Sequence, residues 1–89
     1  MNPKKAVTIV SKEQDKIAEQ VNGIMDRGVT VIYGRGYYTK EPKELLYIVI
    51  SKQEVTMLKK IVRSIDKEAF IAIHDVRDVF GEGFVELAK

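Results

Sequence analysis

The sequence lacks cysteine and any long apolar stretch. Without cysteine the chain cannot form a disulfide, a thiolate metal site or a cysteine nucleophile, a composition that suits a reducing compartment. The longest runs without a charged residue, 28–34 and 45–51, contain seven residues each. A membrane-spanning helix needs roughly twenty apolar residues, so we expect no such helix in this sequence. The basic pair near the start has no apolar core after it, which argues against a signal peptide.

Charge of one sign is not in excess either. The chain has 15 basic and 13 acidic residues, a net charge of +2, and the two signs are interspersed. This pattern is typical of an ordinary solvated surface and does not by itself indicate a nucleic-acid partner. A chain of 89 residues has room for one domain with a modest core. We assign this domain to residues 6–89 and expect residues 1–5 to be a disordered N-terminus.

The first half of the chain has the pattern strand, helix, strand. Residues 6–10 form a β-branched run that predicts a strand, and 11–14 have the spacing of a capping box that starts a helix. Residues 26–28 end this helix, with Gly28 supplying a permissive backbone, and 29–33 predict a second strand. The apolar stripe of the helix consists of Ile17, Val21, Ile24 and Met25.

The second half repeats this pattern. Residues 44–50 and 69–74 predict the third and fourth strands, and 51–54 form a second capping box. Residues 9–14 and 49–54 match at a separation of forty positions, which indicates two copies of one strand-helix-strand unit. The stripe of the second helix consists of Val55, Leu58, Ile61, Val62 and Ile65, and Met57 is also expected in the packing.

The βαββαβ order predicts an α+β fold of the ferredoxin-like type. Right-handed crossovers place two helices on one face of a four-stranded antiparallel sheet, followed by a short C-terminal tail. The opposite sheet face then has no helix to cover it. That face must be polar, be covered by the tail or pair with another subunit, so we expect a homo-oligomer, a dimer or a trimer. The candidates for a mixed surface on it are Thr8, Thr30, Tyr33 and Tyr47.

The loop 34–43 between the second and third strands is the best candidate for a binding site. Backbone amides freed by its glycines can bind an anion, an arginine can clamp it, and tyrosines can stack on a ligand. The dinucleotide fingerprint fails, because Thr39 stands where a third glycine is needed and a strand follows. The alternative is a flexible turn without a ligand. The candidate ligand-binding residues are Arg27, Gly34, Arg35, Gly36, Tyr37, Tyr38 and Thr39.

Two other groupings point to chemistry that the sequence supports less well. Residues 35–38 resemble the opening of an RNA-recognition signature, but that signature belongs on the third strand and needs further aromatic residues. His74, Asp75 and Asp78 offer too few donors for a zinc site, and a lone histidine at a strand end is usually structural. We therefore expect no enzyme activity, no metal, no cofactor and no nucleic-acid partner.

The end of the chain predicts a tail on the sheet. Residues 75–80 are expected to form a helical turn. Gly81 and Gly83 predict a hinge, the alternative being direct contact with a ligand. Phe80 and Phe84 would then dock the tail on the sheet.

A resemblance to a known family is carried by short motifs at 27–31, 36–39, 65–66, 69–70, 75–76 and 81–84. The chain resembles the C-terminal soluble domain of the YitT-like bacterial multi-pass membrane proteins, a domain of unknown function. This resemblance implies a cytoplasmic domain that follows a bundle of membrane helices. The topology is also similar to that of PII-type signalling proteins, whose subunits form trimers and bind small effectors, often adenine nucleotides, beside the loop between strands two and three.

Together these features predict a non-enzymatic cytoplasmic regulatory domain appended to a multi-pass membrane protein. It would self-associate and bind a small anionic ligand, with nucleotides as candidates, near the loop 34–43. The alternative is a purely structural module that joins subunits through the uncovered sheet face or an edge strand and binds no ligand.

Overall fold

The fold is that of a computed structural model, which describes residues 3–80 of the chain. The predicted βαββαβ order is confirmed, with one short 3₁₀ turn, η1, ahead of the second helix. None of the helices within residues 3–80 is long and apolar enough to cross a membrane. The elements are β1 (Lys4–Val10), α1 (Gln14–Met25), β2 (Thr30–Arg35), β3 (Pro42–Ser51), η1 (Lys52–Glu54), α2 (Val55–Ile65) and β4 (Phe70–Val76).

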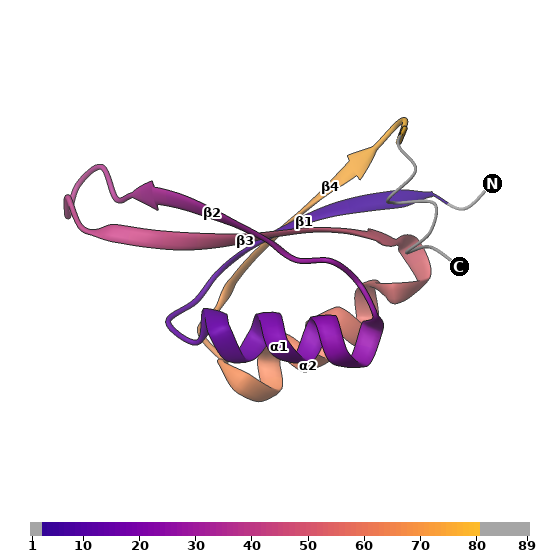
Figure 1. Cartoon of the computed structure of the whole chain (residues 1–89), viewed down its shortest axis with the longest axis horizontal. Coiled ribbons are helices and arrows are strands. Elements are labelled where there is room, and N and C mark those ends of the chain that lie inside the picture. Colours follow the sequence, from indigo (N-terminus) through magenta and orange to yellow (C-terminus); the bar gives the residue numbers. More distant parts are fainter. Residues whose placement is uncertain (1–2, 81–89) are drawn as a thin grey trace.

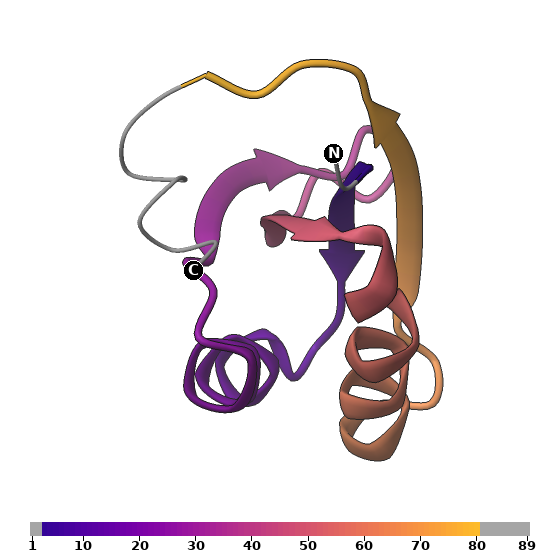
Figure 2. The same ribbon diagram turned by 90° about the vertical axis from the view of Figure 1, so that its right-hand side faces the viewer.

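The four strands form one sheet in the order β2-β3-β1-β4, and every neighbouring pair is antiparallel. Figure 1 shows the sheet above the two helices, and Figure 2, turned by 90°, shows that α1 and α2 lie on the same side of it. The ferredoxin-like fold predicted from the sequence is therefore confirmed. One sheet face packs on the helices, and the other, which we call the open face, has no helix from residues 3–80 on it.

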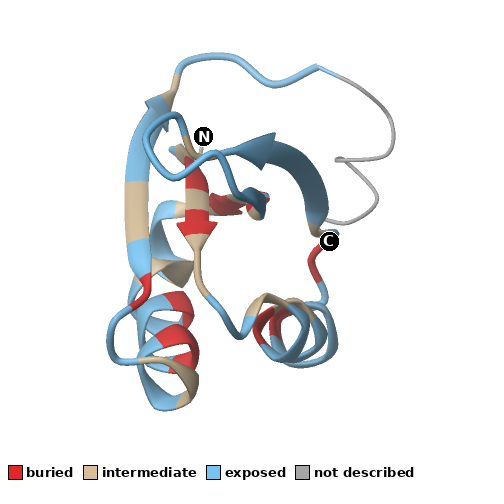
Figure 3. Ribbon diagram, turned by 90° about the vertical axis from the view of Figure 1, so that its left-hand side faces the viewer, coloured by how far each residue is buried: buried red, intermediate tan, exposed pale blue. Residues whose placement is uncertain are grey.

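The hydrophobic core fills the space between the helices and the sheet. Figure 3 shows the buried residues on the sides of the helices and strands that face one another. The predicted stripes are confirmed, except that Ile24 and Met57 are 59% and 50% exposed. Ile24 lies about 100° around α1 from the buried Met25, beyond the side that the sheet covers. The core residues with less than 2% exposure are Val7, Ile9, Ile17, Val21, Leu46, Ile48, Ile50, Leu58 and Val62.

The two predicted capping boxes have different outcomes. The box at 51–54 is confirmed, and Glu54 Oε1 accepts a hydrogen bond from the backbone N–H of Ser51 at 2.8 Å. The box at 11–14 is wrong. The hydroxyl of Ser11 instead donates to Asp66 Oδ2 at 2.6 Å and accepts from the backbone N–H of Glu13 at 2.9 Å. A partner 55 residues away therefore takes the place of a local cap.

The end of α1 also differs from the prediction. The left-handed residue is Asp26, with φ of 55°, and not Gly28. The backbone N–H of Asp26 donates to the carbonyl of Asn22 at 3.1 Å, which closes the last turn. Aspartate is one of the few residue types other than glycine that adopts this conformation at modest cost.

The hairpin between β2 and β3 is longer and its loop shorter than predicted. Gly34 pairs with Lys43 and Arg35 with Pro42, so only residues 36–41 form the loop. Pro42 is compatible with this pairing because it is the first residue of its strand. Backbone bonds close the loop: the N–H of Gly36 donates to the carbonyl of Glu41, and the N–H of Lys40 donates to that of Gly36, both at 2.9 Å.

Apolar side chains continue across the open face. The strand register places four of them in one row over all four strands, and Thr8, Thr30 and Tyr47 form the next row. Tyr33 pairs with Glu44 and lies on the helix side, so it does not belong to this face. The apolar row consists of Phe70, Val10, Leu45 and Ile32.

The tail differs from the prediction as well. Asp75 and Val76 belong to β4, and residues 77–80 form no helical turn. Phe80 is 90% exposed, so the prediction that it docks on the sheet is wrong. The predicted hinge Gly81 and Gly83 and the plug Phe84 lie outside the described residues.

The hairpin loop gives a testable difference between its two glycines. A Cβ on Gly36 would lie 2.6 Å from Thr39 Oγ1, which accepts the backbone N–H of Glu41. A Cβ on Gly34 would lie 3.5 Å from Leu45 Cδ1, an ordinary contact. We expect Gly36→Ala to lower the free energy of unfolding by about 1 kcal/mol and Gly34→Ala to change it by less than about 0.5 kcal/mol, measured by urea denaturation. Equal stability of the two variants would contradict this geometry.

Candidate functional site

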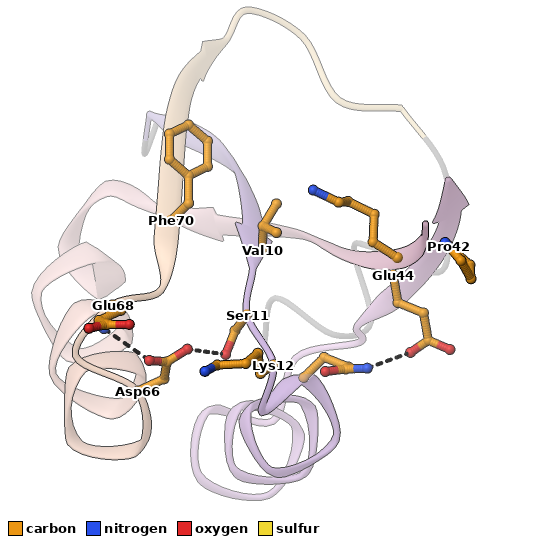
Figure 4. Close-up of a pocket in the computed structure, with 10 residues that line it drawn as sticks. Val10, Ser11, Lys12, Pro42, Glu44, Asp66, Glu68 and Phe70 are labelled. Carbon is orange, nitrogen blue, oxygen red and sulfur yellow. Dashed lines mark hydrogen bonds between the residues drawn. The ribbon is translucent and has the colours of Figure 1, made fainter. Parts of the chain in front are cut away.

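A cleft of about 550 Å³ lies at the end of the sheet where the β2–β3 hairpin begins (Figure 4). Its volume lies within the range of ordinary small-molecule sites, about 300–1,000 Å³. The lining combines cations with carboxylates and a small apolar wall. It consists of the cations Lys12 and Lys43, the carboxylates Glu44, Asp66 and Glu68, the polar Ser11 and Gln14, and the apolar Val10, Pro42 and Phe70.

The sheet register brings these residues together from distant parts of the sequence. Val10, the last residue of β1, pairs with Phe70 at the start of β4 and with Leu45 near the start of β3. The β1–α1 connection, the α2–β4 connection and the start of β3 therefore meet at one end of the sheet. In Figure 4 Phe70 and Val10 lie above Ser11 and Asp66 on the sheet side of the cleft.

Asp66 is held in place by hydrogen bonds. It accepts from the hydroxyl of Ser11 at 2.6 Å and from the backbone N–H of Glu68 at 2.9 Å. These two bonds hold the pKa of the Asp66 carboxyl below its usual value, and the positive charges of Lys12 and Arg63 act in the same direction. Asp66 is therefore ionised at neutral pH, and its bond to Ser11 links the connection ahead of α1 to the end of α2.

The two cations of the cleft come from separate elements. Lys12 lies in the β1–α1 connection and Lys43 in β3, and both are exposed. Within residues 3–80 the salt bridges are Lys5–Asp75 and Arg27–Glu54, so neither cleft lysine is in one. Their ammonium groups can therefore bind an anionic group of a ligand at this site.

A smaller hollow of about 280 Å³ extends the site toward the hairpin. It shares Gln14, Pro42, Lys43 and Glu44 with the cleft, and its further lining residues are Tyr33 and Gly34. Lys43 thus borders both spaces. A ligand in the cleft can reach the base of the hairpin through this hollow.

The structure separates the predicted site residues. Gly34 lines the smaller hollow, at the hairpin base. Arg35 is the last residue of β2, and the loop residues lie beyond it; none of them lines either hollow. The predicted residues outside both hollows are Arg35, Gly36, Tyr37, Tyr38 and Thr39.

Arg27 lies away from the hairpin loop, ahead of the opposite end of β2. It is 6% exposed, and its guanidinium donates to both carboxylate oxygens of Glu54, at 2.9 and 3.3 Å. Its carbonyl accepts from Asn22 Nδ2 at 3.0 Å. These bonds tie the end of α1 to the start of α2, so the structure does not bring Arg27 to the site that the sequence predicted for it.

His74 and Asp75 also do not form a site together. As successive residues of a strand they point to opposite faces of the sheet. Asp75 forms a salt bridge with Lys5, which holds the pKa of its carboxyl below the usual value. Among the described residues there is no group of three His, Asp or Glu side chains placed to hold a metal ion.

Sequence reasoning missed most of the cleft. It interpreted 11–14 and 66–68 only as helix ends, and it did not combine them with the start of the third strand. The observed strand order, with β1 between β3 and β4, brings these three segments to one end of the sheet. The meeting of these segments was the signal that could have predicted the cleft. No local sequence motif marks the charged residues at 12 and 43.

The Ser11–Asp66 bond gives a pH-dependent prediction. Because the folded pKa of Asp66 is lowered, its ionised form stabilises the fold above the unfolded pKa near 4, and this contribution is lost as the pH falls through the folded pKa. Ser11→Ala removes the largest cause of the shift. We expect the loss of unfolding free energy in Ser11→Ala to be larger at neutral pH than at about pH 3, measured by urea denaturation.

Asp66→Asn provides the control for this prediction. In that background no carboxylate titrates at position 66, so Ser11→Ala should cost the same at both pH values. A cost of Ser11→Ala that does not change with pH in the wild-type background would contradict the role given to the bond.

Comparison with known proteins finds relatives among bacterial membrane proteins. The chain is 63% identical over 89 residues, all of its length, to the UPF0750 membrane protein YxkD of Bacillus subtilis (strain 168), covering 32% of that protein. It is 41% identical over 73 residues to the UPF0750 membrane protein YitT of the same organism, covering 82% of this chain and 26% of YitT. The chain thus spans about a third or less of the length of these relatives, and the predicted YitT-like resemblance is confirmed.

Solved structures share the fold. The crystal structure of an uncharacterized protein conserved in bacteria, DUF2179, from Eubacterium ventriosum has a TM-score of 0.73 and 25% identity, covering 80% of this chain and 97% of that one. CPII from Thiomonas intermedia K12, bound to ADP, AMP and acetate, has a TM-score of 0.63 and 14% identity, covering 92% of this chain and 91% of that one. The likeness to CPII shows the fold alone.

The family model described as "Uncharacterized protein conserved in bacteria (DUF2179)" matches residues 27–81, which is more than half of the chain. Its match covers β2, β3, α2 and β4, and so the hairpin and much of the cleft. On this match and on its likeness to the UPF0750 membrane proteins, the chain belongs to the DUF2179 family.

Proposed function

We propose that this chain is a non-enzymatic regulatory domain of a multi-pass membrane protein, on its cytoplasmic side, and that it binds a small ligand with an anionic group. The binding site is the cleft at the hairpin base, and not the loop itself. The observation that carries the proposal is the pair of cations, Lys12 and Lys43, that face one cleft of about 550 Å³ from separate elements. The membrane proteins among its relatives support the placement in a larger chain.

The carboxylates of the cleft restrict the ligand. Glu44, Asp66 and Glu68 repel a ligand that is negative throughout, and they accept hydrogen bonds from its donors. Phe70, which is 62% exposed, offers a flat apolar surface. A nucleotide has all the matching parts: a phosphate for the lysines, amino or hydroxyl donors for the carboxylates and a base that can stack on the ring. The nucleotides bound by CPII, a protein of similar fold, support this class.

The site favours binding over catalysis. The hydroxyl of Ser11 already donates to Asp66, and Asp66 is ionised and held by two hydrogen bonds. A nucleophile would need a free base beside it, and a general acid or base near neutral pH would need a raised carboxylate pKa. The arrangement around Asp66 has the opposite effect on that pKa.

Isothermal titration calorimetry with AMP, ADP, ATP and inorganic phosphate tests the proposal. We expect the wild-type chain to bind at least one of these probes and Lys12→Gln/Lys43→Gln to weaken its binding about tenfold or more, since charged hydrogen bonds contribute about 1.5–3 kcal/mol each. Lys59→Gln/Lys60→Gln removes the same charge from the exposed side of α2 and serves as the matched control. Arg35→Ala, outside the cleft, should also leave binding unchanged.

Two results would contradict this assignment. Absence of binding by all four probes would reject the nucleotide and phosphate classes. Equal weakening in the cleft variant and in the α2 control would show a general charge effect in place of a site.

A second candidate function is self-association through the open face. The apolar row on it includes Ile32, which is 44% exposed, and Tyr47 in the adjacent row is 38% exposed. All residues of the edge strand β2 are exposed. An apolar sheet face with an exposed edge strand is a common surface for pairing between subunits.

Sedimentation velocity tests this second function. We expect an oligomer for the wild-type chain and dissociation in Ile32→Ser/Tyr47→Ser, because each change removes apolar area from the open face and leaves the cleft intact. Ile24→Ser/Met57→Ser, which alters two apolar residues of the helices that are more exposed than Ile32 and Tyr47, is the control. A monomeric wild-type chain, or an oligomer that persists in Ile32→Ser/Tyr47→Ser, would reject the assignment of this surface.

A further inference from the structure

The tip of the β2–β3 hairpin, residues 35–40, lines neither hollow and contributes no side chain to the buried core. It projects beyond the helices at one end of the molecule (Figure 1). Tyr37 and Tyr38 are 85% and 94% exposed, although tyrosine is a residue that usually buries much of its ring. Two adjacent rings this exposed indicate a surface that contacts something outside the chain.

The tip is a built structure that presents these rings. Its turn is closed by the two backbone bonds between Gly36, Lys40 and Glu41. The hydroxyl oxygen of Thr39 also accepts the backbone N–H of Glu41, at 3.3 Å. Lys40 adopts a left-handed backbone, with φ of 64°, and its ammonium nitrogen lies 4.2 Å from the centre of the Tyr37 ring. The turn therefore holds a cation and an aromatic ring at the same point.

The charge of the hairpin end is positive. Arg35, Lys40 and Lys43 are exposed cations, and Glu41 is the one carboxylate between positions 35 and 43. This combination complements a negatively charged surface. The tip residues line neither of the two hollows, so the tip offers no pocket for a compact partner. It is better suited to a partner surface into which the two rings can insert.

We propose that the hairpin tip binds an anionic lipid bilayer. Tyr37 and Tyr38 insert at the level of the headgroups, where amphipathic rings are stable, and Arg35 and Lys40 bind lipid phosphates beside them. The proposal rests on the proposed function only in placing the domain within a membrane protein. Two tyrosines and two or three cations give weak, reversible binding in a free chain, and attachment to a membrane region raises the effective lipid concentration.

Co-sedimentation with vesicles tests the proposal. The 89-residue chain is mixed at low salt with vesicles of phosphatidylcholine alone or of equal parts phosphatidylcholine and phosphatidylglycerol. We expect binding to the anionic vesicles that falls as salt is raised. Arg35→Gln/Lys40→Gln should lower the partition coefficient by about tenfold or more, at about fivefold per cation. Tyr37→Ser/Tyr38→Ser should lower it by about tenfold.

The matched control is Lys59→Gln/Lys60→Gln, which has the same net charge as the tip variant but changes exposed residues of α2. It should remain within about twofold of the wild type in partition. Quenching of tyrosine emission by brominated phosphatidylglycerol provides a second readout, and Tyr37→Ser/Tyr38→Ser should lose most of it. Circular dichroism confirms that each variant is folded.

Three outcomes would overturn the proposal: no binding to anionic vesicles, equal loss in the tip and α2 variants, or binding without tyrosine quenching. A tip that binds a protein partner instead gives the first of these. The nucleotide titration is separate, because it contains no bilayer and because Arg35→Gln/Lys40→Gln changes no residue that lines either hollow. Failure of either proposal is therefore distinguishable from failure of the other.

Discussion

Burial of two helical stripes against one face of the sheet is the constraint on which the other features depend. The stripes carry aliphatic side chains such as Ile17 and Leu58, which are fully buried, and each contributes about 1.5–3 kcal/mol when removed from water. Because the core is small, the loss of one of these side chains would remove a large part of the free energy of unfolding. One-sided burial fixes the strand register, because a slip by one residue would exchange the core face for the open face. It also leaves the second face uncovered.

The same register creates the candidate site. Antiparallel pairing of β1 with both β3 and β4 brings two strand starts and one strand end together. Charged residues in the connections then meet around a single cleft, and Asp66 is held there by Ser11. The ligand chemistry of the domain is therefore a consequence of topology, and each connection contributes only one or two of the side chains. The hairpin, by contrast, presents its tyrosines and cations from one continuous segment.

The two serines at equivalent places in the repeat show how tertiary contacts override a local motif. Ser51 begins a capping box with Glu54, as its sequence predicts. Ser11 has glutamine at the matching position and an aspartate from the other repeat within 2.6 Å, and it binds the aspartate. A charged hydrogen bond to a carboxylate is stronger than a neutral bond to a backbone amide. The serine ahead of the helix thus forms a local capping box in the second repeat and a long-range hydrogen bond in the first.

Periodicity in the sequence by itself determined the number, type and order of the elements, because apolar spacing reports which side of a helix or strand is buried. The placement of both helices on one face of an antiparallel sheet followed from general rules of chain connection. Only the tertiary structure decided that Arg27 pairs with Glu54 and that Lys12 and Lys43 share a cleft, since those pairings join residues far apart in the chain. Local patterns record which residues a segment buries, but the meeting of segments depends on a register and on loop paths that no single segment encodes.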